Sequence, residues 1–291
     1  MNKIDLTSMK AVAVTGATGF VADTLIQKLI KLGVKVHAIA RNEGDLVSLQ
    51  LKYPSIEIFP CPIEDEYLLR KAFSGCDGVF HLAAIKGVHI AEQHPLKTIQ
   101  TNIIGTTNIL KLSVDGNLKF VVAASSDKAE KISGVYGASK YIVEKLFQEF
   151  QSINPEGCCY RVVRFGNVFY STGSVLDVWK KSLEEGSELV ITDPESTRFF
   201  WTKEEAVDSL FECISNMPNA QPYIPEMKSV KIGSLLHEMI SLHGDSSTKI
   251  REIGLGESEN KHEFLVPDVS SQFAKQWKMD DLRKVLKGES K

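Results

Sequence analysis

Short apolar segments alternate with helical patterns along the first half of the chain. The apolar segments have the composition of strands buried on both faces of a parallel sheet, and they lie at residues 11–14, 34–40, 56–59, 78–82, 120–124 and 160–165. The segments between them predict helices at residues 23–31, 44–51, 66–72, 90–112 and 136–150, with a break near Pro95. This order predicts an α/β fold, in which helices cover both faces of a Rossmann-type doubly wound parallel sheet.

A glycine-rich turn joins the first predicted strand to the first predicted helix. Gly16 and Gly19 lie in the turn, and Ala22 occupies the third small position. Small residues there let the backbone approach a pyrophosphate, which binds at the N-terminus of the following helix. An ordinary tight turn is the alternative, but the strand before it and the helix after it favour a dinucleotide site. We therefore expect NAD(P) as the cofactor.

The second predicted strand ends at Arg41, where an acidic residue would bind the ribose diol of NAD. Arg41 could instead pair with the 2′-phosphate of NADP, because guanidinium groups bind phosphates well. A solvated arginine after a strand is the alternative interpretation. The sequence therefore favours NADP mildly over NAD.

The candidate catalytic residues follow the fifth predicted strand. Tyr136 and Lys140 are four residues apart, so a helix places both on one face. A lysine ammonium favours the phenolate, which lets the tyrosine act as an acid/base near neutral pH. Ser126, ten residues before the tyrosine, can hydrogen-bond the same oxygen. This set predicts proton movement at a carbon that loses or gains a hydride.

Asp127 and Lys128 add a second acid/base pair that a plain dehydrogenase would not need. Successive strand residues face opposite ways, so Ser126, Asp127 and Lys128 can meet one ligand only if the chain turns there. An exposed ion pair at a strand end is the alternative. Their position before Tyr136 favours a catalytic role.

Bulk composition excludes several classes of protein. The chain is 43% hydrophobic and 24% charged, and 34 basic residues nearly balance 37 acidic residues, so nothing points to nucleic acid. No apolar run reaches the roughly 18–20 residues that span a bilayer, and residues 1–10 do not resemble a signal peptide. The five cysteines lack the spacing of metal ligands. We expect reduced thiols, no metal, no membrane association and a cytoplasmic location.

The regular alternation of elements ends at Gly166, after which shorter elements and more loops follow. We expect residues 1–166 to form the NAD(P)-binding Rossmann domain and residues 167–291 to form a smaller substrate-binding lobe. A helical segment near residues 202–216 is expected to return to the first domain.

Seven segments of the chain carry a resemblance to a known family. They lie in order at residues 81–92 (HLAAIKGVHIAE), 101–106 (TNIIGT), 126–129 (SDKA), 136–140 (YGASK), 164–168 (RFGNV), 173–175 (GSV) and 197–200 (TRFF). Together they resemble the extended short-chain dehydrogenase/reductase superfamily, and within it the UDP-N-acetylglucosamine 4,6-dehydratases that invert carbon 5. The resemblance covers roughly residues 10–265 and implies polysaccharide biosynthesis in a pathway like that of pseudaminic acid.

The resemblance implies a role for each catalytic residue. Tyr136 takes the proton of the sugar 4-hydroxyl, Lys140 holds the nicotinamide ribose, and Ser126 hydrogen-bonds the developing carbonyl. Lys128 then removes the proton on carbon 5, and Asp127 protonates the departing 6-hydroxyl. Hydride returns to carbon 6, so the cofactor ends unchanged.

The binding residues that we expect fall into two groups. The cofactor-binding residues are Gly16, Thr18, Gly19, Phe20, Val21, Arg41, Ile63, Ala83, Ala84, Tyr136, Lys140 and Phe165. The substrate-binding residues are Lys86, His89, Asn167, Ser174, Val175 and Arg198. The implied ligand is a UDP-N-acetylhexosamine or its 4-keto derivative, and the implied assembly is a homodimer or a higher homo-oligomer.

Some positions depart from the family pattern. The family has arginine at the positions of Thr172 and Gly256, and an adenine-contacting aspartate at the position of Pro62. One alternative is therefore that this chain performs only part of the cycle, by reducing and epimerising a UDP-4-keto-5,6-ene sugar that a partner enzyme makes. A second alternative is a catalytically silent NADP-binding regulator, against which the intact Ser126, Tyr136 and Lys140 argue.

Overall fold

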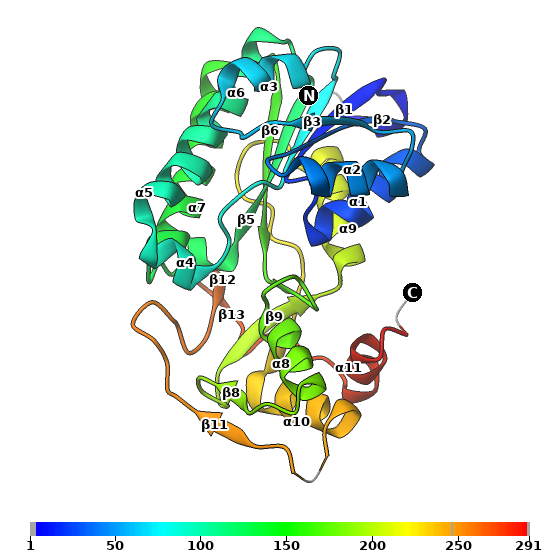
Figure 1. Cartoon of the computed structure of the whole chain (residues 1–291). Helices are drawn as coiled ribbons and strands as arrows, with labels where there is room; N and C mark the ends of the chain where they lie inside the picture. The colour runs from blue at the N-terminus through cyan, green and yellow to red at the C-terminus, as the bar shows by residue number, and fades with distance from the viewer. Residues whose placement is uncertain (1–3, 246, 290–291) are drawn as a thin grey trace.

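In the computed structural model, which describes residues 4–245 and 247–289, six parallel strands form the central sheet in the order β3-β2-β1-β4-β5-β6 (Figure 1). The strands are β1 (Ala11–Thr15), β2 (Lys35–Ala40), β3 (Glu57–Pro60), β4 (Gly78–His81), β5 (Phe120–Ser126) and β6 (Cys159–Phe165). The strand order reverses between β1 and β4, and ligands of such sheets bind at the carboxyl ends of the strands near this reversal. The predicted Rossmann fold is confirmed.

Helices cover both faces of the sheet, because the side chains of each strand alternate between them. Val12 and Val14 of β1 face one hydrophobic core, whereas Ala13 faces another. The first core includes residues of α1 (Phe20–Lys31), α2 (Glu43–Lys52) and α9 (Lys203–Asn216). The second core includes residues of α3 (Glu66–Ala72), α6 (Thr106–Asp115) and α7 (Val135–Ile153).

The long helix predicted at residues 90–112 is interrupted. It consists of α4 (Val88–Gln93), α5 (Pro95–Thr98), a wider π-helical stretch η2 (Ile99–Gly105) and then α6. The break falls at His94 and Pro95, as the sequence predicted, because proline at the start of a helix needs no backbone donor. Among the described residues, no helix has the length and apolar character needed to cross a membrane.

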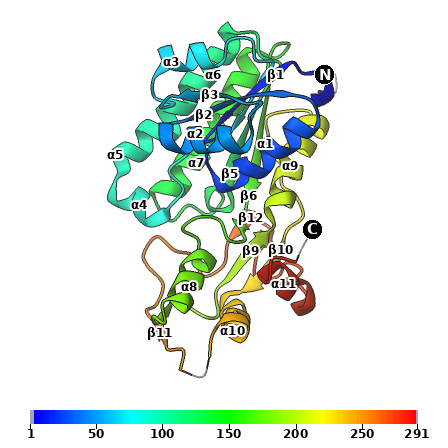
Figure 2. The same ribbon diagram turned by 45° about the vertical axis from the view of Figure 1, so that its right-hand side comes forward.

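The rest of the chain forms smaller sheets beyond the carboxyl ends of the central strands (Figure 2). β10 (Lys228–Lys231), β9 (Thr197–Trp201) and β7 (Asn167–Val168) form one sheet. The other strands pair as β8 (Leu189–Ile191) with β11 (Ile250–Glu252), and β12 (Phe264–Val266) with β13 (Val269–Ser270). Helices α8 (Val175–Glu184), α10 (Ile232–His243) and α11 (Met279–Leu286) pack around a third hydrophobic core. The division into two domains at residue 166 stays a prediction.

Candidate functional site

A cavity of about 890 Å³ lies at the carboxyl edge of the central sheet. It is lined by the glycine-rich turn after β1, the ends of several central strands and segments from the last third of the chain. Every residue that the sequence predicted for catalysis or binding lines this cavity except His89. The side chain of His89 is exposed on α4, so the structure does not bring it into the site.

The glycine-rich turn is shaped to accept a pyrophosphate. Gly16 has a φ of +68°, and a Cβ there would lie 2.8 Å from the backbone nitrogen of Ala83. Gly19 is the N-cap of α1 and provides no side-chain hydrogen bond to the helix N-terminus. The first backbone N–H groups of α1 therefore remain to bind an anion, as in dinucleotide sites. The residues present fit an NAD(P) cofactor.

Arg41 follows β2 and lines the cavity with an exposed side chain. The next residue, Asn42, caps α2 by accepting a hydrogen bond from the backbone nitrogen of Asp45. The guanidinium is thus placed after the strand where a dinucleotide ribose is bound in this fold.

A tight turn after β5 brings the candidate catalytic side chains together. β5 ends at Ser126, and residues Asp127–Ala129 form a 3₁₀ turn, η3. Ser126 Oγ donates to Asp127 Oδ1 over 2.9 Å, and Lys128 Nζ donates to the same oxygen over 3.2 Å. Asp127 is 1% exposed, so the alternative of an exposed ion pair is wrong.

The second carboxylate oxygen of Asp127 is available to a ligand. Its Oδ2 is buried and has no hydrogen-bond partner among the described residues. Buried carboxylate oxygens are normally satisfied, and an unsatisfied one in a cavity is a place where a ligand hydroxyl can bind. Asp127 is therefore equipped to meet a substrate group.

Tyr136 and Lys140 lie in the first turns of α7 and are both buried. Burial raises the pKa of Tyr136, while a hydrogen bond with Ser126 and the charge of Lys128 act in the opposite direction. Lys140 Nζ donates to the carbonyl oxygen of Ala124 over 2.7 Å. Burial lowers the pKa of Lys140 to about 8, although Glu144 opposes this shift.

Lys128 has the opposite electrostatic environment. Burial by itself would lower its pKa, but the carboxylates of Asp127 and Glu263 outweigh that effect and raise it. Lys128 is therefore an ammonium group in this state. Because Asp127 is its nearest acceptor, a proton can pass between the two without leaving the site.

The glycine of the YGASK segment has a packing role. Helix α7 lies against η3, and a Cβ on Gly137 would overlap the carbonyl oxygen of Lys128. Any larger residue would push the helix that carries Tyr136 away from the turn that carries Lys128. The distance between the helix that carries Tyr136 and the turn that carries Lys128 thus depends on this glycine.

The predicted substrate residues surround the outer part of the cavity. Lys86 lies in the loop after β4, Asn167 begins β7, and Ser174 caps α8 one residue before Val175. Arg198 is 9% exposed, and its Nη1 donates to the carbonyl oxygens of Thr197 and Lys261 over 2.9 Å each. Part of the Arg198 guanidinium is therefore committed to the backbone.

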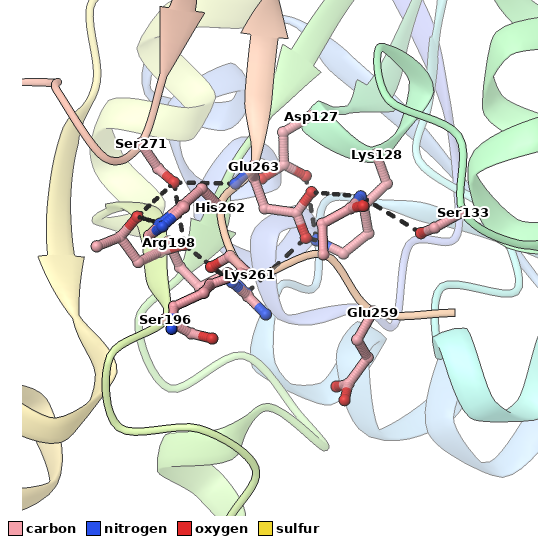
Figure 3. A network of polar contacts seen from close by, with 12 residues as sticks. Asp127, Lys128, Ser133, Ser196, Arg198, Glu259, Lys261, His262, Glu263 and Ser271 are labelled. Carbon is pink, nitrogen blue, oxygen red and sulfur yellow. Dashed lines mark hydrogen bonds and ion pairs between the residues drawn. The ribbon is translucent and has the colours of Figure 1, made fainter. Parts of the chain in front are cut away.

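The segment before β12 contributes residues to the cavity that were not expected from the sequence. Ser258, Glu259 and Glu263 line the cavity, and Glu263 is 2% exposed beside Lys128 and Arg198 (Figure 3). The family pattern pointed to this segment only through the missing arginine at Gly256 and did not single out these residues, because their contacts join segments that are far apart in the chain. The only local feature that could have indicated Glu263 is its position directly before the short apolar strand β12.

The fold and the site together define an extended short-chain dehydrogenase/reductase. The strand order, the glycine-rich turn and the buried Ser126, Tyr136 and Lys140 are its defining parts. The model of one family, described as "Polysaccharide biosynthesis protein", matches residues 12–283. The chain belongs to this family, which confirms the resemblance inferred from the sequence.

Individual relatives agree with this assignment. The chain is 32% identical to the inverting UDP-N-acetylglucosamine 4,6-dehydratase of Campylobacter jejuni, over 88% of this chain and 77% of that protein. It is 25% identical to Pen from Bacillus thuringiensis, whose crystal structure superposes with a TM-score of 0.89 over 96% of this chain and 98% of that one. DesIV, a dTDP-glucose 4,6-dehydratase from Streptomyces venezuelae solved with NAD bound, is 18% identical and shares the fold, with a TM-score of 0.81 over 95% and 96% of the two chains.

Proposed function

We propose that this protein is an NAD(P)-dependent enzyme that dehydrates UDP-N-acetylglucosamine across carbons 4 to 6 and inverts carbon 5. The observation that carries this proposal is the ion pair of buried Asp127 with partly buried Lys128, next to Ser126 and Tyr136. An enzyme that only oxidises and re-reduces carbon 4 needs the Ser126, Tyr136 and Lys140 set but no second pair. Removal of a proton from carbon 5 and protonation of a leaving hydroxyl need one base and one acid.

The cofactor, when bound, would accept a hydride from carbon 4 and return it to carbon 6. Tyr136 would take the proton of the 4-hydroxyl, with Ser126 holding the same oxygen by a hydrogen bond. Lys140 would position the nicotinamide ribose. Because Ser126, Tyr136 and Lys140 are buried, water would be excluded from the reacting carbon when substrate is bound.

Dehydration would then use the second pair. Transfer of one proton from the Lys128 ammonium to Asp127 gives a neutral amine and a carboxylic acid, 3.2 Å apart. The amine would take the proton of carbon 5, which the adjacent ketone acidifies. Asp127 would protonate the 6-hydroxyl, which leaves as water, and the pair is then again an ammonium and a carboxylate. Inversion requires that carbon 5 be reprotonated on the face opposite Lys128 by a proton from solvent, and release of the proton that Tyr136 took from the 4-hydroxyl balances this uptake.

A partial cycle is the second candidate function. Thr172 lines the cavity at a position where the family resemblance implies an arginine, and a lost arginine weakens or redirects pyrophosphate binding. This chain would then act on a 4-keto or 5,6-ene derivative that another enzyme supplies. Either activity fits a pathway that makes a pseudaminic acid-like glycan.

Mass spectrometry of the product from UDP-N-acetylglucosamine in deuterated water tests the proposal. We expect a product that has lost one water and gained one deuterium, with carbon 5 inverted by nuclear magnetic resonance. An isomer without mass change or deuterium would show a 4-epimerase. Turnover of only the 4-keto or 5,6-ene derivative would show the partial cycle, and no turnover of any of them would favour the silent regulator.

The preference for NADP rests on Arg41. Replacement of Arg41 by aspartate should move the ratio of affinities toward NAD, because a carboxylate repels the 2′-phosphate and accepts hydrogen bonds from a ribose diol. Titration of both cofactors into the purified Arg41→Asp variant measures the ratio. If the ratio does not move, Arg41 has no part in cofactor choice.

A further inference from the structure

A buried carboxylate outside every recognised motif faces the catalytic pair. Glu263 Oε1 lies 3.4 Å from Lys128 Nζ and 3.8 Å from Arg198 Nε, and Glu263 lines the cavity (Figure 3). Both distances exceed those of short hydrogen bonds, so the carboxylate is close to two cations but is not tightly bound to either of them. Such loose contacts are common in sites that tighten when substrate binds.

The backbone holds Glu263 firmly in this place. Its N–H donates to Ser271 Oγ over 2.9 Å, and the N–H of Ser271 donates back to the Glu263 carbonyl over 2.8 Å. Two residues later, the carbonyl oxygen of Leu265 accepts from Arg164 Nη1. Arg164 is itself paired with Glu144 of α7 over 2.8 Å, so the position of Glu263 is tied to the helix that carries Tyr136.

A fully buried carboxylate is costly unless cations or donors surround it. Glu263 is 2% exposed, and its cations are a proposed catalytic base and a proposed substrate residue. A carboxylate kept only for folding would have no reason to face the reaction cavity. We propose that Glu263 is a positioning residue, which holds the Lys128 ammonium beside Asp127 and sets the pH at which Lys128 can act as a base. This inference rests on the proposed function for the role of Lys128.

The charges around Lys128 come from four elements. Asp127 lies in η3, Glu263 lies just before β12, Arg198 belongs to β9, and Tyr136 belongs to α7. Burial lowers the pKa of Lys128, but Asp127 and Glu263 raise it and prevail over burial and Arg198. Removal of the Glu263 charge should therefore lower this pKa. The free amine would then become available at lower pH.

Glu263→Gln keeps the size of the side chain and removes only its charge. In this variant the pH profile for deuterium uptake at carbon 5 should be displaced to lower pH by about one unit, so uptake at a fixed pH below the pKa of Lys128 should rise up to about tenfold, since a neighbouring opposite charge shifts a pKa by roughly 1–3 units. The first hydride step, followed as cofactor reduction in a single turnover, should change much less. Glu257→Gln is the matched control, because Glu257 lies in the same segment with an exposed side chain, and its profile should stay that of the wild type.

Glu263→Asp provides the rescue, because it restores the charge at a slightly greater distance. Its profile should lie between those of the wild type and Glu263→Gln. An unshifted profile in Glu263→Gln, or a rise in KM alone at constant kcat, would overturn the inference. The second result would make Glu263 a substrate contact.

Amine labelling of the free enzyme separates this inference from the proposed function. Acetic anhydride acylates an amine only in its neutral form, so the labelling of Lys128 at pH 8, measured by peptide mass spectrometry against exposed Lys111, reports its protonation without any substrate. Labelling should rise several-fold in Glu263→Gln and not in Glu257→Gln. Equal labelling in the two variants would overturn the inference, whereas raised labelling in an enzyme without turnover would overturn only the proposed function.

Discussion

Two lysines of the site, buried Lys140 and partly buried Lys128, have pKa values that are shifted in opposite directions by their surroundings. Lys128 faces two carboxylates, which raise its pKa. Lys140 faces the carbonyl oxygen of Ala124, and burial lowers its pKa to about 8. Both lysines could be selected from the sequence, but their pKa shifts could not, because these depend on burial and, for Lys128, on the distant carboxylate of Glu263.

Lys140 should give the stability of the protein a distinct pH dependence. Its pKa falls from 10.5 to about 8 on folding, so the unfolded chain binds more protons between these values and the free energy of unfolding rises with pH there. The cost of the buried charge, on the order of 3 kcal/mol, is fully present below pH 8 and absent above 10.5. Lys140→Met lacks this cost, so its melting temperature relative to the wild type should be highest below pH 8.

Thermal melts of both cofactor-free proteins at intervals from pH 7 to 10.5 measure this difference. Loss of the hydrogen bond to Ala124 destabilises the variant by an amount that does not depend on pH. The test is therefore how the difference in melting temperature changes with pH, and not its absolute size. A difference that stays constant over this range would show that Lys140 is not buried as a charge.

Removal of the Tyr136 hydroxyl should abolish hydride transfer. Tyr136→Phe deletes the acid/base but little binding surface, so turnover should fall by at least a hundredfold while UDP-sugar affinity stays within a few fold. Stopped-flow absorbance of the reduced nicotinamide and calorimetric titration of the UDP-sugar measure the two quantities. Unchanged turnover would mean that another group carries this proton.

At the scale of elements, the contact between α7 and η3 sets the geometry of the site. Strands and helices were predictable because apolar runs and helical periodicity are local properties of the sequence. The catalytic hypothesis required the chain to turn after Ser126 so that three successive side chains could meet one ligand. The structure has this turn at Asp127–Ala129. Glu263 was not predictable, because its role follows from how β12 docks on this turn and not from any local pattern.

Replacement of Gly137 by alanine should separate the two acid/base pairs. The added Cβ would overlap the carbonyl oxygen of Lys128, so α7 or η3 must shift by part of an ångström. Catalysis is sensitive to shifts of this size, and kcat should fall at least tenfold while cofactor affinity changes less. Gly44→Ala is the control, because Gly44 is exposed in α2 with room for a Cβ; equal activity of the two variants would contradict this role.

At the scale of the whole molecule, one cavity joins the first glycine-rich turn to residues from the last third of the chain. The turn and the strand ends could be predicted from the sequence, and so could the placement of Ser126, Asp127, Lys128, Tyr136 and Lys140 in this cavity. The outer wall could be predicted only in part, and His89 lies outside it. The missing part comes from the segment between β11 and β12, whose sequence carries no recognisable binding pattern.

The protein should purify with nicotinamide cofactor bound. The proposed reaction returns the hydride in every turnover, so release of the cofactor is unnecessary, and the turn at Gly16 and Gly19 is shaped to hold it. Mass spectrometry of the supernatant after denaturation identifies what is released and in what ratio to protein. A titration in which neither NAD nor NADP binds would contradict the cofactor site itself.

Glu263 also fixes when the site is completed during synthesis of the chain. The ribosome makes the cofactor turn first, the catalytic turn and Tyr136 next, and Glu263 more than a hundred residues later. A nascent or prematurely terminated chain therefore contains the parts that capture a nicotinamide before it contains the carboxylate that governs Lys128.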